Sequence, residues 1–441
     1  MVDVEGTVAA GFERVADAFA RNFAQLDEIG ASVAVYHDGR LVVDLAGGSD
    51  PVFRRSFRRD SPVMVASCSK AATATCVLML VERGVLDVDE KVSAYWPEFG
   101  QAGKADVTLR QVLSHQAGLP YPNPGCGLTG LDLLAGPRLL RQLERQAPWW
   151  RPGTAYAYHP VTWGTILGEL VRRAAGQTIG EWFAANVAAP LHLDFWIGLP
   201  AALDERVVPG VWRTGGRAST EPAGAGAPQP GSHAARRLAA IAERPPREPD
   251  ARDPTSRRAY YGLEVPAAHG VANARSLARM MAALVGEIGG MRLLSPRNVA
   301  EATTPQTDDV PPMAEGPAAG PPLRFGLGYQ LPSTSMLGLS AGSFGDTGAG
   351  GRLAFADADA GVGFGYVCNS VRDIGPGGDP RWGKLLDALR ACLRASRGPS
   401  TRLRSPRGVS NRAVAPRRPP ADLGVPGVGD RAPGRVPGPG P

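Results

Sequence analysis

Cysteine is scarce in this 441-residue sequence, and its few copies are not arranged as a disulfide framework or a metal site. The number of cysteines is odd, they are widely scattered, and they form neither a C-x-x-C pair nor a spacing with histidine that is typical of zinc. We therefore expect reduced thiols and no metal. The five cysteines are Cys68, Cys76, Cys126, Cys368 and Cys392.

Long apolar runs are also missing. No stretch approaches the roughly 20 apolar residues that a membrane-spanning helix needs. The acidic N-terminus, residues 1–6, lacks the charged and then apolar pattern of a secretory signal. We therefore expect a cytoplasmic protein without a transmembrane segment.

Excess positive charge is absent from most of the chain, although the net charge is +6. The residues from Ser396 to Pro441 contain nine Arg and two Asp, a balance of +7, so residues 1–395 carry −1. This balance gives no reason to expect nucleic acid or a membrane surface as a partner of the folded part. The tail over 396–441 is rich in Pro, Gly and Arg with scarcely any apolar periodicity, which predicts disorder.

A serine and a lysine stand three residues apart just before an apolar segment. Ser67 and Lys70 precede the run 71–80, which predicts a helix, and residues i and i+3 share one helix face. A serine becomes a nucleophile when a neighbouring base takes its proton, and a lysine can be that base if burial or positive charge lowers its pKa. The alternative is a serine N-cap followed by a solvent-facing lysine.

The remaining pattern predicts an antiparallel sheet covered by helices. Apolar residues recur at helical spacing over 8–29, and residues 31–36 and 41–45 form two predicted strands around an Asp-Gly turn. Loop-like segments are expected over 213–256 and 304–322. Further strands are predicted at 325–330, 350–356 and 362–368, and further helices at 131–147, 163–175 and 384–395.

Two tyrosines and a histidine are additional candidates. Tyr156 and Tyr158 follow a Pro-Gly turn and precede a predicted helix, which suits the wall of an active site, although most tyrosines are packing aromatics. His115 ends a short predicted helix that Thr108 would cap. A histidine between a helix end and a glycine turn more often makes structural hydrogen bonds than catalytic ones.

Three motifs in this order make the sequence resemble the serine β-lactamase and penicillin-binding-protein superfamily. The class C-like branch, which contains the family VIII carboxylesterases, is the most similar, and the resemblance extends over about residues 5–395. Supporting segments occur at 96–99, 113–120, 152–154 and 325–328. The motifs are Ser67-Cys68-Ser69-Lys70, Tyr156-Ala157-Tyr158-His159-Pro160 and Phe344-Gly345-Asp346-Thr347-Gly348-Ala349-Gly350-Gly351.

The resemblance implies a role for each matching residue of the first two motifs. Ser67 would be the acyl-accepting nucleophile, and Lys70 would lower its proton affinity. Tyr158 would be the general base in acylation and the acid towards the leaving group. Tyr156 is the second choice for that role, and His159 completes a Tyr-His pair known in relatives.

The third motif would line the site and departs from the family pattern. Asp346, Thr347 and Gly348 match the Lys-Thr-Gly or His-Thr-Gly strand, and the N–H groups of Ser67 and Ala349 would form the oxyanion hole. At Asp346 β-lactamases have a lysine that helps hold the substrate carboxylate. Two carboxylates 4 Å apart repel by about 1 kcal/mol in water and several-fold more in a drier pocket. Asp346 could also raise the pKa of Lys70 and weaken it as a base.

A second departure is Pro160, which stands where the family has an asparagine and offers no side-chain group to a substrate amide. Both departures disfavour β-lactams and D-Ala-D-Ala peptides and leave neutral esters acceptable. An impaired enzyme therefore remains an alternative.

We therefore expect an α+β fold of the β-lactamase/transpeptidase-like type in one domain, residues 1–395. An antiparallel sheet flanked by helices (about 5–84 and 271–395) would carry an inserted, mostly helical region (about 85–270). The predicted function is a serine hydrolase that forms an acyl-enzyme on Ser67, most simply a carboxylesterase on short-chain esters. Its partner would be a small-molecule ester or amide, with no metal or organic cofactor, and the oligomeric state is open. Weak β-lactamase or D-amino-acid peptidase activity is one alternative, and an impaired binding or regulatory homologue is another.

Overall fold

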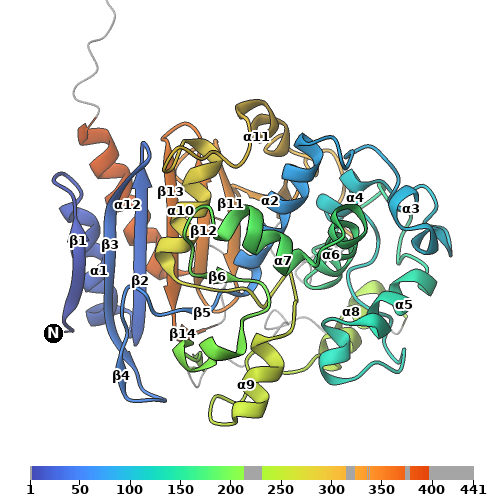
Figure 1. Cartoon of the computed structure of the whole chain (residues 1–441), viewed down its shortest axis with the longest axis horizontal. Coiled ribbons are helices and arrows are strands. Elements are labelled where there is room, and N and C mark those ends of the chain that lie inside the picture. Colours follow the sequence, from blue (N-terminus) through green and yellow to red (C-terminus); the bar gives the residue numbers. More distant parts are fainter. Residues whose placement is uncertain are drawn as a thin grey trace, which may run out of the picture. The chain divides into compact units, whose positions relative to one another are not determined.

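An antiparallel sheet dominates the part of the chain that the computed structural model describes, which is residues 2–212, 231–313, 323–334, 336, 338–372 and 378–396. Its strands follow the order β1-β3-β2-β13-β12-β11-β10-β9, and β4 pairs with β3. The first strands of the chain thus lie beside the last ones (Figure 1). The strands are β1 (Val4–Val8), β2 (Gly30–His37), β3 (Arg40–Asp50), β4 (Arg55–Ser56), β9 (Arg324–Phe325), β10 (Gln330–Leu331), β11 (Ser343–Gly348), β12 (Arg352–Asp357) and β13 (Val362–Cys368).

Alternation along the central strands gives the sheet two apolar faces. Val33 and Val35 of β2 belong to one buried cluster, with α1 (Glu13–Gln25) and α12 (Pro380–Ser396). Ala34 and Tyr36 belong to a second cluster on the opposite face, with α2 (Ser69–Glu82) and α10 (Ala274–Val285). Successive side chains of a strand point to opposite faces, so one strand contributes to both cores.

Glycines let α10 approach the sheet closely. A Cβ atom at Gly365 of β13 would lie 2.3 Å from the carbonyl oxygen of Ala274, and one at Gly363 would lie 2.4 Å from that of Ala278. Both contacts are shorter than real Cβ atoms allow, so the glycines in this strand permit a helix-to-sheet distance that alanine would prevent.

A mostly helical region packs on the far side of α2 (Figure 1). Its helices are α3 (Val92–Tyr95), α4 (Leu109–Leu113), α5 (Pro137–Arg145), α6 (Thr162–Ala175), α7 (Ile179–Phe183), α8 (His233–Ala242) and α9 (Pro254–Tyr261), and α11 (Pro296–Ala302) follows α10. Two small sheets are also present. One has the strand order β5 (Val63–Met64), β8 (Val271–Ala272), β6 (Phe195–Trp196), and the other pairs β7 (Val211–Trp212) with β14 (Ser370–Val371). No helix among the described residues has the length and apolar character needed to cross a membrane.

The α+β fold with an antiparallel sheet and many helices, expected from the sequence, is confirmed. The Asp-Gly turn between β2 and β3 has positive φ at both residues, +47° at Asp38 and +77° at Gly39, as a two-residue hairpin loop requires.

Three local expectations are corrected. The strand expected over 325–330 is divided into β9 and β10, which pair with each other, and residues 326–329 connect them. The segment that starts at residue 8 was expected to be helical, but the chain first forms β1 and enters α1 only at Glu13. The expected loop over 213–256 contains α8, capped by Ser232, while 213–230 lies outside the described residues. Residues 314–322 of the second expected loop and 397–441 of the tail also lie outside them. The boundaries of the domain and of its two parts stay a prediction.

Candidate active site

Ser67 lies in a tight turn that precedes α2. The turn, Ala66–Cys68, is a single 3₁₀ turn, and Ala66 adopts a left-handed φ of +48° that alanine rarely takes. The hydroxyl of Ser69 donates to the carbonyl oxygen of Ala66 at 2.6 Å and accepts from the N–H of Gly270 at 2.8 Å. Through Ser69 the turn is bonded to the residue before β8, and this contact holds Ala66 in its unfavourable backbone conformation. Ser67 itself is partly exposed.

Lys70 lies one turn along α2 and is buried, with 1% of its surface exposed. Its Nζ lies 3.4 Å from Ser67 Oγ and donates to the carbonyl oxygens of Pro160 at 2.9 Å and Ala267 at 2.8 Å. It also lies 4.7 Å from the centre of the Tyr158 ring. A neutral amine has two N–H donors, and the two carbonyls can accept both, which leaves its lone pair available to Ser67.

The environment of Lys70 favours this neutral form. Burial lowers the pKa of Lys70 to about 7; the negative charge of Asp346 raises it, and the positive charge of Arg244 lowers it. The influence of Asp346 expected from the sequence is therefore present, but desolvation outweighs it.

Tyr158 completes the contact with Ser67. Its hydroxyl donates to Ser67 Oγ at 2.7 Å, and its ring stacks on Phe325 with 6.2 Å between ring centres. Burial raises the pKa of Tyr158 well above its ordinary value of 10. The free site therefore holds a neutral phenol, which is suited to donating a proton rather than taking one.

Tyr156, the second choice, lies elsewhere. Its side chain packs edge-on against Phe325 with 6.4 Å between ring centres, and its backbone pairs with Pro311 and Met313. Between the two tyrosines, the structure brings Tyr158 to the serine.

Two histidines near Tyr158 make hydrogen bonds to the backbone of its segment. His159 uses both ring nitrogens on backbone groups: Nε2 accepts from the N–H of Leu119, and Nδ1 pairs with the carbonyl oxygen of Ala157. His115 Nδ1 accepts from the N–H of His159 at 3.1 Å. Burial lowers the pKa of His159 to about 4 and that of His115 well below 6.5. Both rings are neutral at pH 7 and fix the backbone of the segment that carries Tyr158.

Strand β11 forms the opposite wall. Thr347 donates to Gln330 Oε1 at 3.2 Å and is partly exposed, whereas Asp346 and Gly348 are buried. A Cβ atom at Gly348 would lie 2.4 Å from the carbonyl oxygen of Val65, so only glycine lets the end of β11 approach the turn of Ser67.

Asp346 is not the permanent carboxylate that the sequence suggested. Burial raises the pKa of Asp346 to about 8, and the positive charge of Lys70 only partly offsets this. At pH 7 most of the group is protonated. The repulsion of an anionic substrate, expected from the sequence, therefore applies above about pH 8.

The backbone N–H groups expected to form the oxyanion hole are available. Ala349 directly follows β11, which packs against the Ser67 turn. Within the described ranges, no protein acceptor pairs with the N–H of Ser67 or of Ala349. Ser67, Tyr158, Thr347 and Ala349 are each partly exposed among buried neighbours, which marks the opening of the site.

Pro160 contributes through its backbone. The sequence departs from the family here by losing an asparagine side chain, yet the Pro160 carbonyl accepts directly from Lys70. The position keeps an acceptor for the lysine, although it presents no side-chain amide to a substrate.

One residue near the site was not foreseen. Arg244 follows α8, in a segment expected to be a loop, and its charge acts on both Lys70 and Tyr158. Its guanidinium lies 5.9 Å from the ring centre of Tyr121, and both residues line a small pocket. The segment shows little periodicity in the sequence, so no local pattern placed this arginine at the site.

The five cysteines are unpaired, in agreement with the thiols expected from the sequence. Within the described parts of the chain, no cluster of three or more His, Cys, Asp or Glu side chains is arranged to hold a metal ion.

Comparison with known proteins assigns the chain to a family. The family model described as Beta-lactamase matches residues 19–388. The chain is 34% identical over 387 residues to the esterase/beta-lactamase LipL of Mycobacterium tuberculosis, a match that covers 83% of each protein.

Solved structures agree. A family VIII carboxylesterase superposes with a TM-score of 0.76 at 34% identity over 88% of this chain and 100% of that one. A penicillin-binding protein homologue from Caulobacter crescentus superposes with a TM-score of 0.73 at 32% identity over 88% and 100% of the two chains. The chain therefore belongs to the beta-lactamase family.

Proposed function

We propose that this serine hydrolase is a carboxylesterase that cleaves short-chain esters through an acyl-enzyme on Ser67. One observation carries the proposal: a partly exposed serine hydroxyl lies within 3.4 Å of a buried lysine and 2.7 Å of a tyrosine hydroxyl. The similarity to LipL, named as an esterase as well as a beta-lactamase, and to a solved family VIII carboxylesterase supports the same reaction class.

Acylation begins when Ser67 gives its proton to neutral Lys70. The Oγ atom then bonds to the carbonyl carbon of the ester, and the negative charge moves to the carbonyl oxygen, where the N–H groups of Ser67 and Ala349 stabilise it. When the carbon–alkoxy bond breaks, Tyr158 gives its proton to the departing alcohol, and the proton on Lys70 restores Tyr158. We assign the first transfer to Lys70 rather than to Tyr158 because the tyrosine pKa is raised and the lysine pKa is lowered.

Deacylation reverses these transfers with water as the nucleophile. Neutral Lys70 accepts one proton of the water as its oxygen bonds to the acyl carbon. The bond to Ser67 Oγ then breaks, Tyr158 gives its proton to Oγ, and the proton on Lys70 restores Tyr158. The products are the acid and the free enzyme, and no cofactor takes part in any step.

Neutral esters are the substrates that the site favours. The position that holds a lysine in β-lactamases is Asp346 here, and Pro160 offers no side-chain amide. Neither supplies a cation for a substrate carboxylate, and above about pH 8 Asp346 adds a negative charge. Weak β-lactam hydrolysis is the second candidate function, because the chain belongs to the beta-lactamase family. A chromogenic cephalosporin measures it beside the ester.

The test compares the wild type with Ser67→Ala on a p-nitrophenyl butyrate ester and on a chromogenic cephalosporin. Mass spectrometry after treatment with a fluorophosphonate then locates the label. We expect ester turnover to fall on the order of 10³-fold or more in Ser67→Ala and the label to map to Ser67. Ser93→Ala, a surface serine bonded to the carbonyl of Ala105, serves as the matched control.

Equal turnover in wild type and Ser67→Ala, with no label, would refute the hydrolase and favour the impaired binding homologue. A higher specificity constant on the cephalosporin than on the ester would make β-lactamase the principal activity. The expected cytoplasmic location and the absence of nucleic-acid partners stay predictions from the sequence.

A further inference from the structure

The turn that carries the proposed oxyanion donor has all four of its carbonyl groups bound. This turn, residues 348–351, joins β11 to β12. The N–H of Gly351 donates to the carbonyl oxygen of Gly348 at 3.1 Å and closes the turn. Since the carbonyl of Gly348 and the N–H of Ala349 belong to one planar peptide, this bond also fixes the direction of the N–H.

Three side chains hold the remaining carbonyls. Arg352 Nη1 donates to the carbonyl oxygen of Ala349 at 2.7 Å, and Arg381 Nη2 donates to that of Gly350 at 3.1 Å. Trp382 Nε1 donates to that of Gly351 at 2.9 Å. Three successive carbonyls are thus tied to donors, while the N–H of Ala349 has no described protein acceptor.

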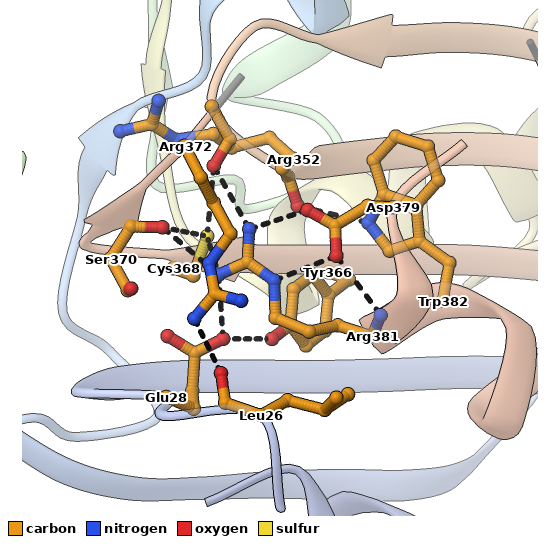
Figure 2. A network of polar contacts seen from close by, with 12 residues as sticks. Leu26, Glu28, Arg352, Tyr366, Cys368, Ser370, Arg372, Asp379, Arg381 and Trp382 are labelled. Atoms are coloured by element: carbon orange, nitrogen blue, oxygen red, sulfur yellow. Dashed lines mark hydrogen bonds and ion pairs between the residues drawn. The ribbon is translucent and has the colours of Figure 1, made fainter. Parts of the chain in front are cut away.

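The donors are rigid because they are buried and charge-balanced. Arg381 is fully buried and pairs with Glu28 at 2.8 Å and Asp379 at 2.5 Å, and Tyr366 donates to the same Glu28 oxygen (Figure 2). Arg352 is 1% exposed and pairs with Glu248 at 3.2 Å. Buried ion pairs add little net stability, so a positional role better explains why three of them lie next to one turn.

The turn needs glycine at two positions because a side chain there would collide with these donors. A Cβ atom at Gly350 would lie 2.4 Å from Arg352 Nη1, and one at Gly351 would lie 1.9 Å from Arg381 Nη2. Both glycines have positive φ, +89° and +106°, which L side chains rarely adopt.

We propose that Arg352, Arg381 and Trp382 are positioning residues that aim the Ala349 N–H at the oxyanion of the acylation and deacylation steps. We call this set the turn clamp. The proposal rests on the proposed hydrolase function for its kinetic consequence, but the immobilisation of the turn can be measured without turnover. Arg352 is the most informative member because the carbonyl it binds belongs to Ala349, the residue whose N–H is the proposed oxyanion donor.

The kinetic test uses Arg352→Met with a p-nitrophenyl ester and the matching thionoester. Loss of an oxyanion donor lowers kcat by about 10²–10³-fold, and misaiming one lowers it less, so we expect a fall of about 10–100-fold with KM changed less than about threefold. Sulfur is a poor hydrogen-bond acceptor, so the ratio of ester to thionoester rates should fall in the variant. Arg352→Lys, which keeps a donor, should recover part of both values.

A matched control is Arg257→Met. Arg257 is also a buried arginine, bonded to the carbonyl of Ala251 and to Glu205, and none of its described partners belongs to the site. The Arg257→Met variant should have a lower melting temperature but an unchanged ratio of ester to thionoester rates. Trp382→Phe removes one donor and keeps the apolar ring, so it provides a milder clamp variant if Arg352→Met does not fold.

Hydrogen–deuterium exchange of peptides covering residues 344–356 tests the clamp independently. Exchange should quicken in Arg352→Met and Trp382→Phe relative to Arg257→Met. Unchanged exchange, or unchanged kcat and sulfur ratio in variants that remain Ser67-dependent, would overturn the turn clamp. Absence of Ser67-dependent turnover in the wild type would instead refute the hydrolase, and the exchange result would still decide whether the turn is held.

Discussion

The hydroxyl of Tyr158 donates to the hydroxyl of Ser67 at 2.7 Å although 91 residues separate them in the chain. The helical region supplies the tyrosine, and the turn before α2 supplies the serine. Lys70 contacts both residues: its Nζ lies 3.4 Å from Ser67 Oγ and 4.7 Å from the centre of the Tyr158 ring. The reaction therefore depends on how the helical region sits on the sheet.

Replacing Tyr158 by Phe should lower kcat on a p-nitrophenyl ester by about 10²–10⁴-fold, the usual range for loss of a general acid. Tyr156→Phe is the matched control, since that ring packs against Phe325 and should keep kcat within about twofold. Steady-state kinetics on both variants decides between the two tyrosines. A larger loss in Tyr156→Phe would reverse the assignment.

Replacing Lys70 by Met should slow acylation strongly without unfolding the protein. The proposed base is lost, so kcat should fall by about 10²–10⁴-fold. The buried amine is replaced by an apolar chain of similar length, so the melting temperature should stay or rise, although the Pro160 and Ala267 carbonyls lose their donor. Stopped-flow fluorophosphonate labelling, with circular dichroism as the check on folding, measures both; labelling at the wild-type rate would exclude Lys70 as the base.

Much of this site could be predicted because its signals are local. Three features each depend on residues only a few positions apart, and simple backbone geometry explains each of them. They are the Ser67 and Lys70 spacing, the Asp-Gly hairpin and the Thr108 cap of α4. The family resemblance then supplied the order of the distant motifs, and the serine hydrolase class and the fold it implied are confirmed.

The parts that could not be predicted depend on long-range burial. Asp346 was expected to be an anion, but only the packed structure shows the desolvation that raises its pKa to about 8. Arg244 comes from a segment without apolar periodicity, and Arg352 and Arg381 act on backbone carbonyls that the sequence cannot place. β1 is a short edge strand, and its residues are largely exposed, so no core pattern marked it.

The pH profile should report the Lys70 amine. The active form of the base is neutral, so kcat/KM should rise with pH through about 7 and level off above it. Asp346 is mostly protonated at pH 7, so Asp346→Asn removes only a small part of a negative charge and should move the rise slightly to lower pH. Arg244→Met removes a positive charge that lowers the pKa, so the rise should move to higher pH. Shifts in the same direction for both variants would contradict the assignment to Lys70.

Discrimination against anionic substrates should grow with pH. Asp346 ionises above about pH 8, so the ratio of cephalosporin to neutral ester turnover should fall between pH 7 and pH 9 in the wild type. Asp346→Asn cannot ionise, and its ratio should stay flat over the same range. Parallel rate measurements at each pH provide the ratio, and a wild-type ratio as flat as that of the variant would show that Asp346 does not face the substrate carboxylate.

Removing one charge from the network around Arg381 should destabilise the fold far more than removing one from the surface. Glu28 and Arg381 have fully buried side chains 2.8 Å apart, and Glu28→Gln leaves the guanidinium with Asp379 as its remaining anion (Figure 2). Breaking a buried pair from one side costs about 3–5 kcal/mol, and the lower end applies here because Asp379 still compensates part of the charge. Asp106→Asn, which breaks the exposed pair with Lys91, is the control and should barely move the urea midpoint. Equal midpoints for the two variants would mean that the buried network does not hold the sheet to α12, and the turn clamp would then lack the rigid base from which Arg381 acts.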